Sequence, residues 1–317
     1  MATETTRELQ TALSDPDATR RQLALIDRAD DIGIGDLGAL VAAVSDGDPT
    51  VRRLAVGLLE ELGDARALPA IVSALADSDA GVREAAQSAV REFRGQGALA
   101  PLVAATRHEH PEVREWAVIG LRELRDEGAM SALLAALTDP VPAVRRAAVV
   151  SVAYLRSSGS APALLARLDD DDAGVRRLAI AALARTANAE TWTPRVAPRL
   201  SDESWQVRVE AAQALGDSRA PEVVSPLVRA LGDDHWQVVK AAVVALDTLG
   251  ARASATHLLP LLANPAPDVR RAAAEALGHL GSEAARSDLS HLTADGDVEV
   301  RKAASRALDR LGKAQPI

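Results

Sequence analysis

The 317-residue sequence contains no cysteine, which excludes disulfide bonds, thiolate catalysis and metal sites with sulfur ligands. Aromatic residues are also scarce, since the chain has one Phe, one Tyr and four Trp. The short alternating runs of β-branched and aromatic residues that predict strands are missing, and alanine and aliphatic residues supply most of the hydrophobic fraction of 48%. These absences favour an all-α protein made of closely packed helices.

An excess of positive charge is missing too, because 36 Lys and Arg stand against 45 Asp and Glu, for a formal net charge of −9. Proteins that neutralise phosphates normally show the opposite balance, so nucleic acid is not an expected partner. The sequence has no apolar run long enough to cross a bilayer, and the opening MATETTRELQ has no apolar signal-peptide core. We therefore expect a cytoplasmic protein that does not contact membranes.

A short phrase recurs through the chain with a spacing of 31 residues, or once 32. Its copies are Val51-Arg52, Val82-Arg83, Val113-Arg114, Val144-Arg145, Val175-Arg176, Val207-Arg208, Val269-Arg270 and Val300-Arg301. Val238-Val239-Lys240 fills the one gap, and Thr19-Arg20 is interpreted as the first copy. Ten copies at a fixed period predict a repeat protein.

Each repeat is predicted to hold two helices. Alanine four residues after the valine and leucine eight after it lie on one face of a helix, called helix B. Upstream apolar segments such as LPAIVSAL (68–75) and SPLVRAL (225–231) predict an earlier helix A. Asp48, His110 and Asp297 are expected to cap the start of helix B, and Gly63, Gly95, Gly250, Gly281 and Gly312 are expected to end it.

The sequence thus predicts an α-solenoid, a superhelix of about ten two-helix repeats with the recurring valines buried. We expect one solenoid over residues 1–317, with an N-terminal capping repeat at 1–33, central repeats at 34–281 and a C-terminal capping repeat and tail at 282–317.

The phrases DGDPTVRRLAVGLLEELGD, DSDAGVREAAQSAVREFRG and NPAPDVRRAAAEALGHLG resemble the PBS-lyase-like HEAT repeat family of bacterial and archaeal proteins. The resemblance covers essentially the whole chain. It implies one of three roles: a protein-binding scaffold, an accessory factor in bilin attachment to phycobiliproteins, or an enzyme related to deoxyhypusine hydroxylase. That hydroxylase binds two irons through His-Glu pairs on several helices, whereas this chain has one such pair, His108-Glu109, in a predicted turn.

We therefore predict a non-catalytic scaffold or adaptor that holds a protein or peptide partner on the concave face lined by helix B, without a cofactor. The alternative is an accessory lyase or maturation factor that presents a cofactor or substrate to a client protein. A metal-dependent enzyme is disfavoured, and no nucleophile with a neighbouring base is found.

His108 and His110 are the candidate metal ligands, since imidazole and carboxylate together suit divalent ions. The alternative is that His110 replaces the aspartate that caps helix B, within a solvated turn. The repeated arginines allow two interpretations as well, a phosphate-binding stripe or a hydrogen-bonded ladder with the acidic turns. The nearby carboxylates favour the ladder.

Two groups of residues are predicted to bind a partner. The position six residues after the valine is polar in the outer repeats but is Ile119 and Val150 in middle ones, and Trp116 and Tyr154 lie close by helical spacing. These four side chains form either an exposed apolar patch or a tighter contact between helices. The second group is the edge formed by Trp205, Gln206, His235, Trp236 and Gln237, where the two tryptophans begin consecutive helices B and are expected to lie side by side. In the alternative, each indole covers the end of its own repeat.

Overall fold

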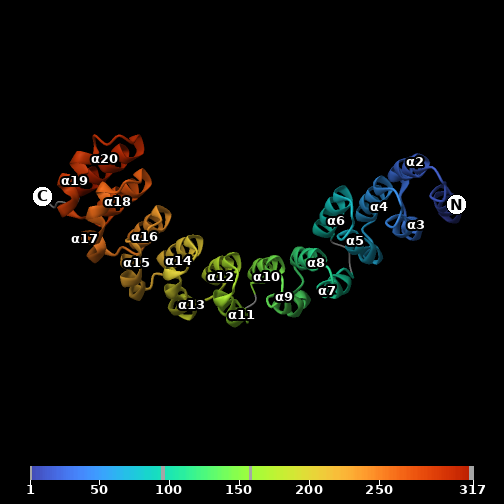
Figure 1. The fold of residues 1–317 in the computed structure, drawn as a ribbon, viewed down its shortest axis with the longest axis horizontal. Coiled ribbons are helices and arrows are strands. Elements are labelled where there is room, and N and C mark those ends of the chain that lie inside the picture. Colours follow the sequence, from blue (N-terminus) through green and yellow to red (C-terminus); the bar gives the residue numbers. More distant parts are fainter. Residues whose placement is uncertain (1, 94–96, 157–158, 314–317) are drawn as a thin grey trace. The chain divides into compact units, whose positions relative to one another are not determined.

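The computed structural model describes residues 2–93, 97–156 and 159–313, and over these residues it contains α-helices and short 3-10 turns but no strand (Figure 1). The A helices are α1 (Ala2–Ala12), α3 (Leu37–Ala43), α5 (Leu68–Ala74), α7 (Leu99–Ala105), α9 (Met130–Ala136), α11 (Ala161–Ala166), α13 (Ala189–Val196), α15 (Val224–Ala230), α17 (Ala255–Leu258) and α19 (Arg286–Leu292). The B helices are α2 (Ala18–Arg28), α4 (Pro49–Leu62), α6 (Ala80–Glu92), α8 (Pro111–Leu124), α10 (Pro142–Leu155), α12 (Ala173–Thr186), α14 (Trp205–Asp217), α16 (Trp236–Thr248), α18 (Pro267–His279) and α20 (Val298–Lys313). The predicted all-α solenoid of ten two-helix repeats is confirmed.

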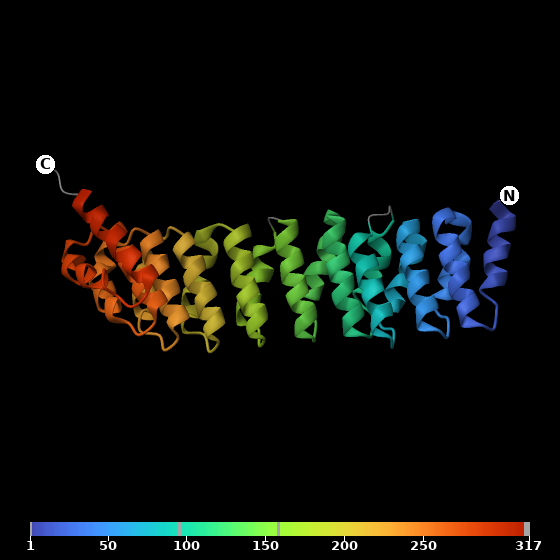
Figure 2. The ribbon, with the colours of Figure 1, turned by 90° about the horizontal axis from the view of Figure 1, so that it is seen from above.

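The repeats fall into two compact units, Met1–Ser160 with α1 to α10 and Ala161–Ile317 with α11 to α20. Within each unit the A helices form one layer and the B helices the other (Figure 1). Figure 2 shows the helices of each unit side by side, so each repeat contacts its sequence neighbours. In the part of the chain that is described, no helix is long and apolar enough to span a membrane.

The recurring valines form the core, as predicted. All nine, from Val51 to Val300, are at most 1% exposed, and the alanines four residues later are fully buried. Small residues let consecutive B helices approach closely. A methyl group added at Gly278 would lie 2.7 Å from the Cα of Ala307, and one added at Gly216 would lie 2.8 Å from the Cα of Ala245. Neighbouring B helices therefore pack closely, and leucines of the A helices, such as Leu40, Leu102 and Leu164, complete the core of each unit.

The helix ends follow most of the predicted punctuation. The carboxylate of Asp48 accepts the backbone N–H of Val51 at 3.0 Å, as an N-cap should. Gly63, Gly250 and Gly281 end their helices with φ angles of 63°, 62° and 71°, in the left-handed region that favours glycine. Gly312 lies within α20, which is described as far as Lys313. Gly95 lies outside the described residues.

Candidate partner-binding surface

A ladder of arginine–aspartate pairs joins successive repeats along the turns between helix A and helix B. Arg52 donates from Nε and Nη2 to the two carboxylate oxygens of Asp77 in the next repeat, both at 2.7 Å, and from Nη1 to the carbonyl of Asp46 in its own turn at 2.9 Å. The same two-bond pair recurs at Arg21–Asp46, Arg114–Asp139, Arg176–Asp202, Arg208–Asp233 and Arg270–Asp295. These guanidinium groups are therefore engaged within the protein, which supports the ladder over a phosphate-binding stripe.

The ladder also sets the register of the first repeat. Arg21 pairs with Asp46 in the way that Arg52 pairs with Asp77, and these arginines are 31 residues apart. The interpretation of Thr19-Arg20 as the first copy was thus off by one residue. With the corrected register, Leu23 and Ile26 are the counterparts of Leu54 and Gly57 on helix B, and they are 52% and 54% exposed.

Two positions of the repeat depart from the arginine–aspartate pattern in the sequence. Where Val239 replaces the arginine, the next turn carries Asn264 instead of aspartate, so both members of the pair have become neutral together. At the other position His108 replaces the aspartate, and Arg83 is hydrogen-bonded to the carbonyls of Asp77 and Ser78 in its own turn. At the first of these positions, where Val239 and Asn264 are both neutral, no charged group is left without a partner.

His108 and His110 differ in role from the sequence interpretation. His108 Nδ1 accepts the backbone N–H of His110 at 3.1 Å, the bond that an aspartate makes in other turns. His110 stands at the N-cap of α8, where other repeats have an aspartate, as predicted, but its side chain makes no capping hydrogen bond, so that part of the expectation was wrong. The two rings lie 5.5 Å apart, and the described residues contain no group of three His, Asp or Glu side chains arranged to hold a metal.

Trp116, Ile119, Val150 and Tyr154, called here the Trp116 patch, lie on the neighbouring helices α8 and α10. Val150 and Tyr154 are 36% and 40% exposed, and Trp116 and Ile119 are partly exposed, so none of the four is enclosed between repeats. Arginines flank the two aromatic rings. The Cζ of Arg91 lies 5.3 Å from the centre of the Trp116 ring, and the Cζ of Arg125 lies 5.5 Å from that of Tyr154. Burial raises the pKa of Glu115, which precedes Trp116 on α8, and Arg146 partly opposes that rise.

The tryptophan edge is arranged differently from the expectation. Trp205 and Trp236 do begin α14 and α16, and Trp236 is 41% exposed. Trp205 is only partly exposed, and its ring stacks on His235, with ring centres 5.9 Å apart and planes inclined by 16°. Trp236 instead has the Nζ of Lys240 5.8 Å from its ring centre. The two indoles therefore have separate neighbours, because the histidine before α16 takes the place beside Trp205.

Sequence reasoning missed the residues that line a pocket together with Trp205. A pocket of about 610 Å³ between α12 and α14 is lined by Trp205 and Gln206 together with Arg177, Glu210 and Gln213. A signal was present in the sequence, since Glu210 stands three residues after Val207, where the other eight aligned copies from Val51 to Val300 carry only apolar residues.

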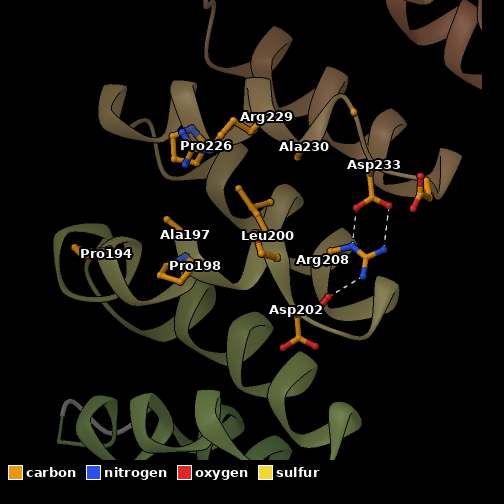
Figure 3. A pocket seen from close by; sticks show the side chains of 13 residues that line it. Pro194, Ala197, Pro198, Leu200, Asp202, Arg208, Pro226, Arg229, Ala230 and Asp233 are labelled. Carbon is orange, nitrogen blue, oxygen red and sulfur yellow. Dashed lines mark hydrogen bonds and ion pairs between the residues drawn. The ribbon is translucent and has the colours of Figure 1, made fainter.

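A second pocket, of about 690 Å³, lies between the helix-A segments of two consecutive repeats (Figure 3). Pro194, Pro198 and Pro226 line one part of it, and the pair Arg208–Asp233 lines the other. Arg208 Nη1 also donates to the carbonyl of Asp202 at 2.7 Å. The charged groups of the ladder that line this pocket thus already satisfy one another.

Comparison with known proteins identifies the family. The family model described as HEAT repeats matches residues 37–109, 99–184, 193–271 and 255–317, most of the chain. No curated protein matches. Among solved structures, an engineered protein is 20% identical over 97% of this chain and 99% of its own, with a TM-score of 0.54.

Two natural solved structures are also similar. YibA of Escherichia coli is 19% identical over 82% of this chain and 96% of its own, with a TM-score of 0.64. A chain from the structure of Kap95p bound to RanGDP is 13% identical over 97% of this chain but 48% of its own, with a TM-score of 0.66. At these identities the structures show a shared fold, an α-solenoid, and carry no information on function. The repeat matches and the fold agree, and the chain belongs to the HEAT-repeat family.

Proposed function

We propose that this protein is a non-catalytic scaffold that holds a protein or peptide partner on its helix-B face, with the Trp116 patch as an anchor. The observation that carries the proposal is the partial exposure of four large side chains, Trp116, Ile119, Val150 and Tyr154, on two adjacent B helices. Isolated exposed apolar residues need no explanation, but a contiguous group with aromatic members is typical of an interaction surface. HEAT-repeat solenoids commonly use their long surfaces to bind proteins.

Leu23 and Ile26 extend the proposed surface to the first B helix. Both are more than half exposed and follow the register of Trp116 and Ile119, three and six residues after the position of the recurring valine. Repetition of apolar side chains at the same two positions of helix B favours a long contact with an extended partner.

The edge formed by Trp205, Gln206, His235, Trp236 and Gln237 is proposed as a second contact region, within residues 161–317. Its support is the exposure of Trp236 and the fixed, stacked position of Trp205. Rigid aromatic side chains lose little conformational entropy when a partner covers them, which makes them effective anchors.

Affinity capture from the source cells tests the proposal. The variant W116A/Y154A should lose captured proteins that the wild type enriches, by at least ten-fold, since truncation of an aromatic anchor costs about 2 kcal/mol or more. The matched control is Leu134→Ala, which trims a partly exposed leucine in the helix-A layer. If both variants capture the same proteins as the wild type, the patch is not an anchor.

The same experiment addresses the alternative of an accessory lyase or maturation factor. The repeat phrase around each Val-Arg pair supports the further proposal that the chain belongs to the PBS-lyase-like subset of HEAT proteins. A captured client that carries a covalent cofactor, detected by mass spectrometry, would favour the accessory role over a plain scaffold.

A further inference from the structure

The pocket between α12 and α14 has features that packing does not explain. Its lining comes from both helices, with Ala173, Gly174 and Arg177 on one side and Ser204, Trp205, Gln206, Val209, Glu210 and Gln213 on the other. Its volume of about 610 Å³ falls in the range of ligand-binding pockets. The pocket lies wholly within residues 161–317.

Glu210 is a carboxylate with few partners. Its side chain is 22% exposed, and Nη1 of Arg177 lies 3.5 Å from its Oε2, longer than a good charge-assisted hydrogen bond. By contrast, Asp202 in the same unit receives two bonds from Arg176 at 2.7 and 2.8 Å. Burial raises the pKa of Glu210, and Arg177 opposes that rise. The carboxylate thus retains acceptor capacity that the protein leaves largely unused.

The repeat pattern does not predict a carboxylate at this position, and Val209 stands before it where the other aligned copies carry a charged residue. The equivalent position of helix B is apolar in every other aligned copy, namely Leu54, Ala85, Trp116, Ala147, Leu178, Ala241, Ala272 and Ala303. A partly buried acid at a position that otherwise holds apolar residues costs stability, because desolvation disfavours its charged form. A cost of this kind at a pocket is the pattern expected of a binding group.

Trp205 provides a rigid wall beside the carboxylate. His235 from the following repeat stacks on the indole, while the pocket is completed by α12 of the preceding repeat, so the ring lies between them. His235 is itself held by Nη2 of Arg208 at 3.2 Å from its Nδ1. Ser204 Oγ donates to Gln206 Oε1 at 2.8 Å, which leaves the amide nitrogen of Gln206 available as a donor.

We propose that this pocket receives the guanidinium group of an arginine side chain from a protein partner, stacked on Trp205 and paired with Glu210. A planar cation matches both the indole face and the two carboxylate oxygens. The net charge of −9 favours approach of a basic segment. Arg177 is displaced toward solvent on binding, since its side chain is already 45% exposed and is held by the single long contact. This inference rests on the proposed scaffold function and names the chemistry of one contact.

The test uses the full chain and the peptide acetyl-Gly-Gly-Arg-Gly-Gly-amide, followed through the indole N–H signal of Trp205 by NMR. A peptide with citrulline in place of arginine keeps the shape but removes the charge. We expect the arginine peptide to shift the Trp205 signal and the citrulline peptide to bind at least ten-fold more weakly. Equal binding of the two peptides would overturn the proposal, as would tighter binding of free arginine than of the arginine peptide.

Variants separate recognition from folding. Glu210→Gln keeps the shape of the side chain and should weaken the arginine peptide at least ten-fold, while Arg177→Gln should tighten it a few-fold by removing the competing cation. Glu275→Gln, on α18 and outside the pocket lining, serves as the matched control and should change affinity less than two-fold. An unchanged affinity in Glu210→Gln, with unaltered circular dichroism, would contradict the assignment.

Failure of this inference is distinguishable from failure of the scaffold proposal. The Trp116 patch lies in residues 1–160 and the arginine pocket in residues 161–317, so W116A/Y154A should leave peptide binding intact. Loss of protein capture in W116A/Y154A with no peptide binding in the wild type would support the scaffold and overturn the pocket.

Discussion

Removal of one arginine from the ladder should destabilise the protein far more than removal of the whole pair. In Arg52→Val, the Asp77 carboxylate keeps the backbone N–H of Asp79 at 2.8 Å but loses both bonds from Arg52. The two side chains are 13% and 12% exposed. Deletion of one member of a buried ion pair costs about 3–5 kcal/mol, and the remaining access of water lowers the expected loss here to about 2–4 kcal/mol.

The double variant Arg52→Val with Asp77→Asn copies the natural pair Val239 and Asn264. Asn264 still accepts the backbone N–H of Ala266 at 2.9 Å, so an asparagine preserves the turn. With neither charge left unpaired, the double variant should lie within about 1 kcal/mol of the wild type, and the coupling energy between the two positions should exceed about 1.5 kcal/mol.

Urea unfolding at 25 °C, followed by circular dichroism, measures these free energies, and an unchanged slope would show that the same surface unfolds. The Arg52 hydrogen bonds lower the pKa of Asp77 in the folded state despite its burial. A lowered carboxyl pKa stabilises the fold above the unfolded value of about 3.9, and that contribution is lost as the pH falls through the folded pKa. The gap between Arg52→Val and the wild type should therefore shrink below pH 4. A loss under about 0.5 kcal/mol at pH 7, or a double variant as unstable as the sum of the single ones, would refute the ladder's role.

Three further predictions follow from single positions. Gly278→Ala should lose about 1–3 kcal/mol in urea unfolding, because its methyl group would meet the backbone of the next B helix, whereas Gly57→Ala in open space should gain about 0.5–1 kcal/mol. His108→Asp should gain about 1 kcal/mol in the same assay by giving Arg83 a carboxylate partner, and no gain would show that the ladder is not continuous there. Because burial raises the pKa of Glu210, arginine-peptide binding should begin to weaken, as the pH falls, above the ordinary glutamate pKa of about 4.3. An affinity that stays unchanged down to pH 4 would contradict this.

The sequence predicted the architecture well because nearly the same residue pattern recurs in each repeat. Each buried valine lies in the same local context, and the alanine four residues later specifies the same helix contact nine times. The ladder could also be predicted from the sequence, since arginine and aspartate recur in most repeats at nearly fixed spacing. The sequence could not predict which aspartate each arginine pairs with, because spacing alone does not show that Arg52 reaches Asp77 of the following repeat.

The errors lie where neighbouring repeats differ from one another. The first repeat has no valine, so the sequence misplaces its register by one residue, and the pair Arg21–Asp46 gives the correct one. The tryptophan edge was predicted from equivalent positions, but side chains on adjacent helices compete for the same space, and His235 rather than Trp236 stacks on Trp205. The arginine pocket depends on one substitution, Glu210, whose meaning appears only when α12 and α14 are brought together.

Site-specific photo-crosslinking tests the central claim, that the helix-B face holds a protein partner, most directly. A benzoylphenylalanine placed at Val150, exposed on α10, is compared with one placed at Ser131, exposed on α9 in the helix-A layer. In extracts of the source cells, the probe at position 150 should form a discrete adduct with one protein, and W116A/Y154A should fail to capture that same protein. The probe at position 131 should form no such adduct. Adducts of the same protein at both positions, or at 131 alone, would contradict the account.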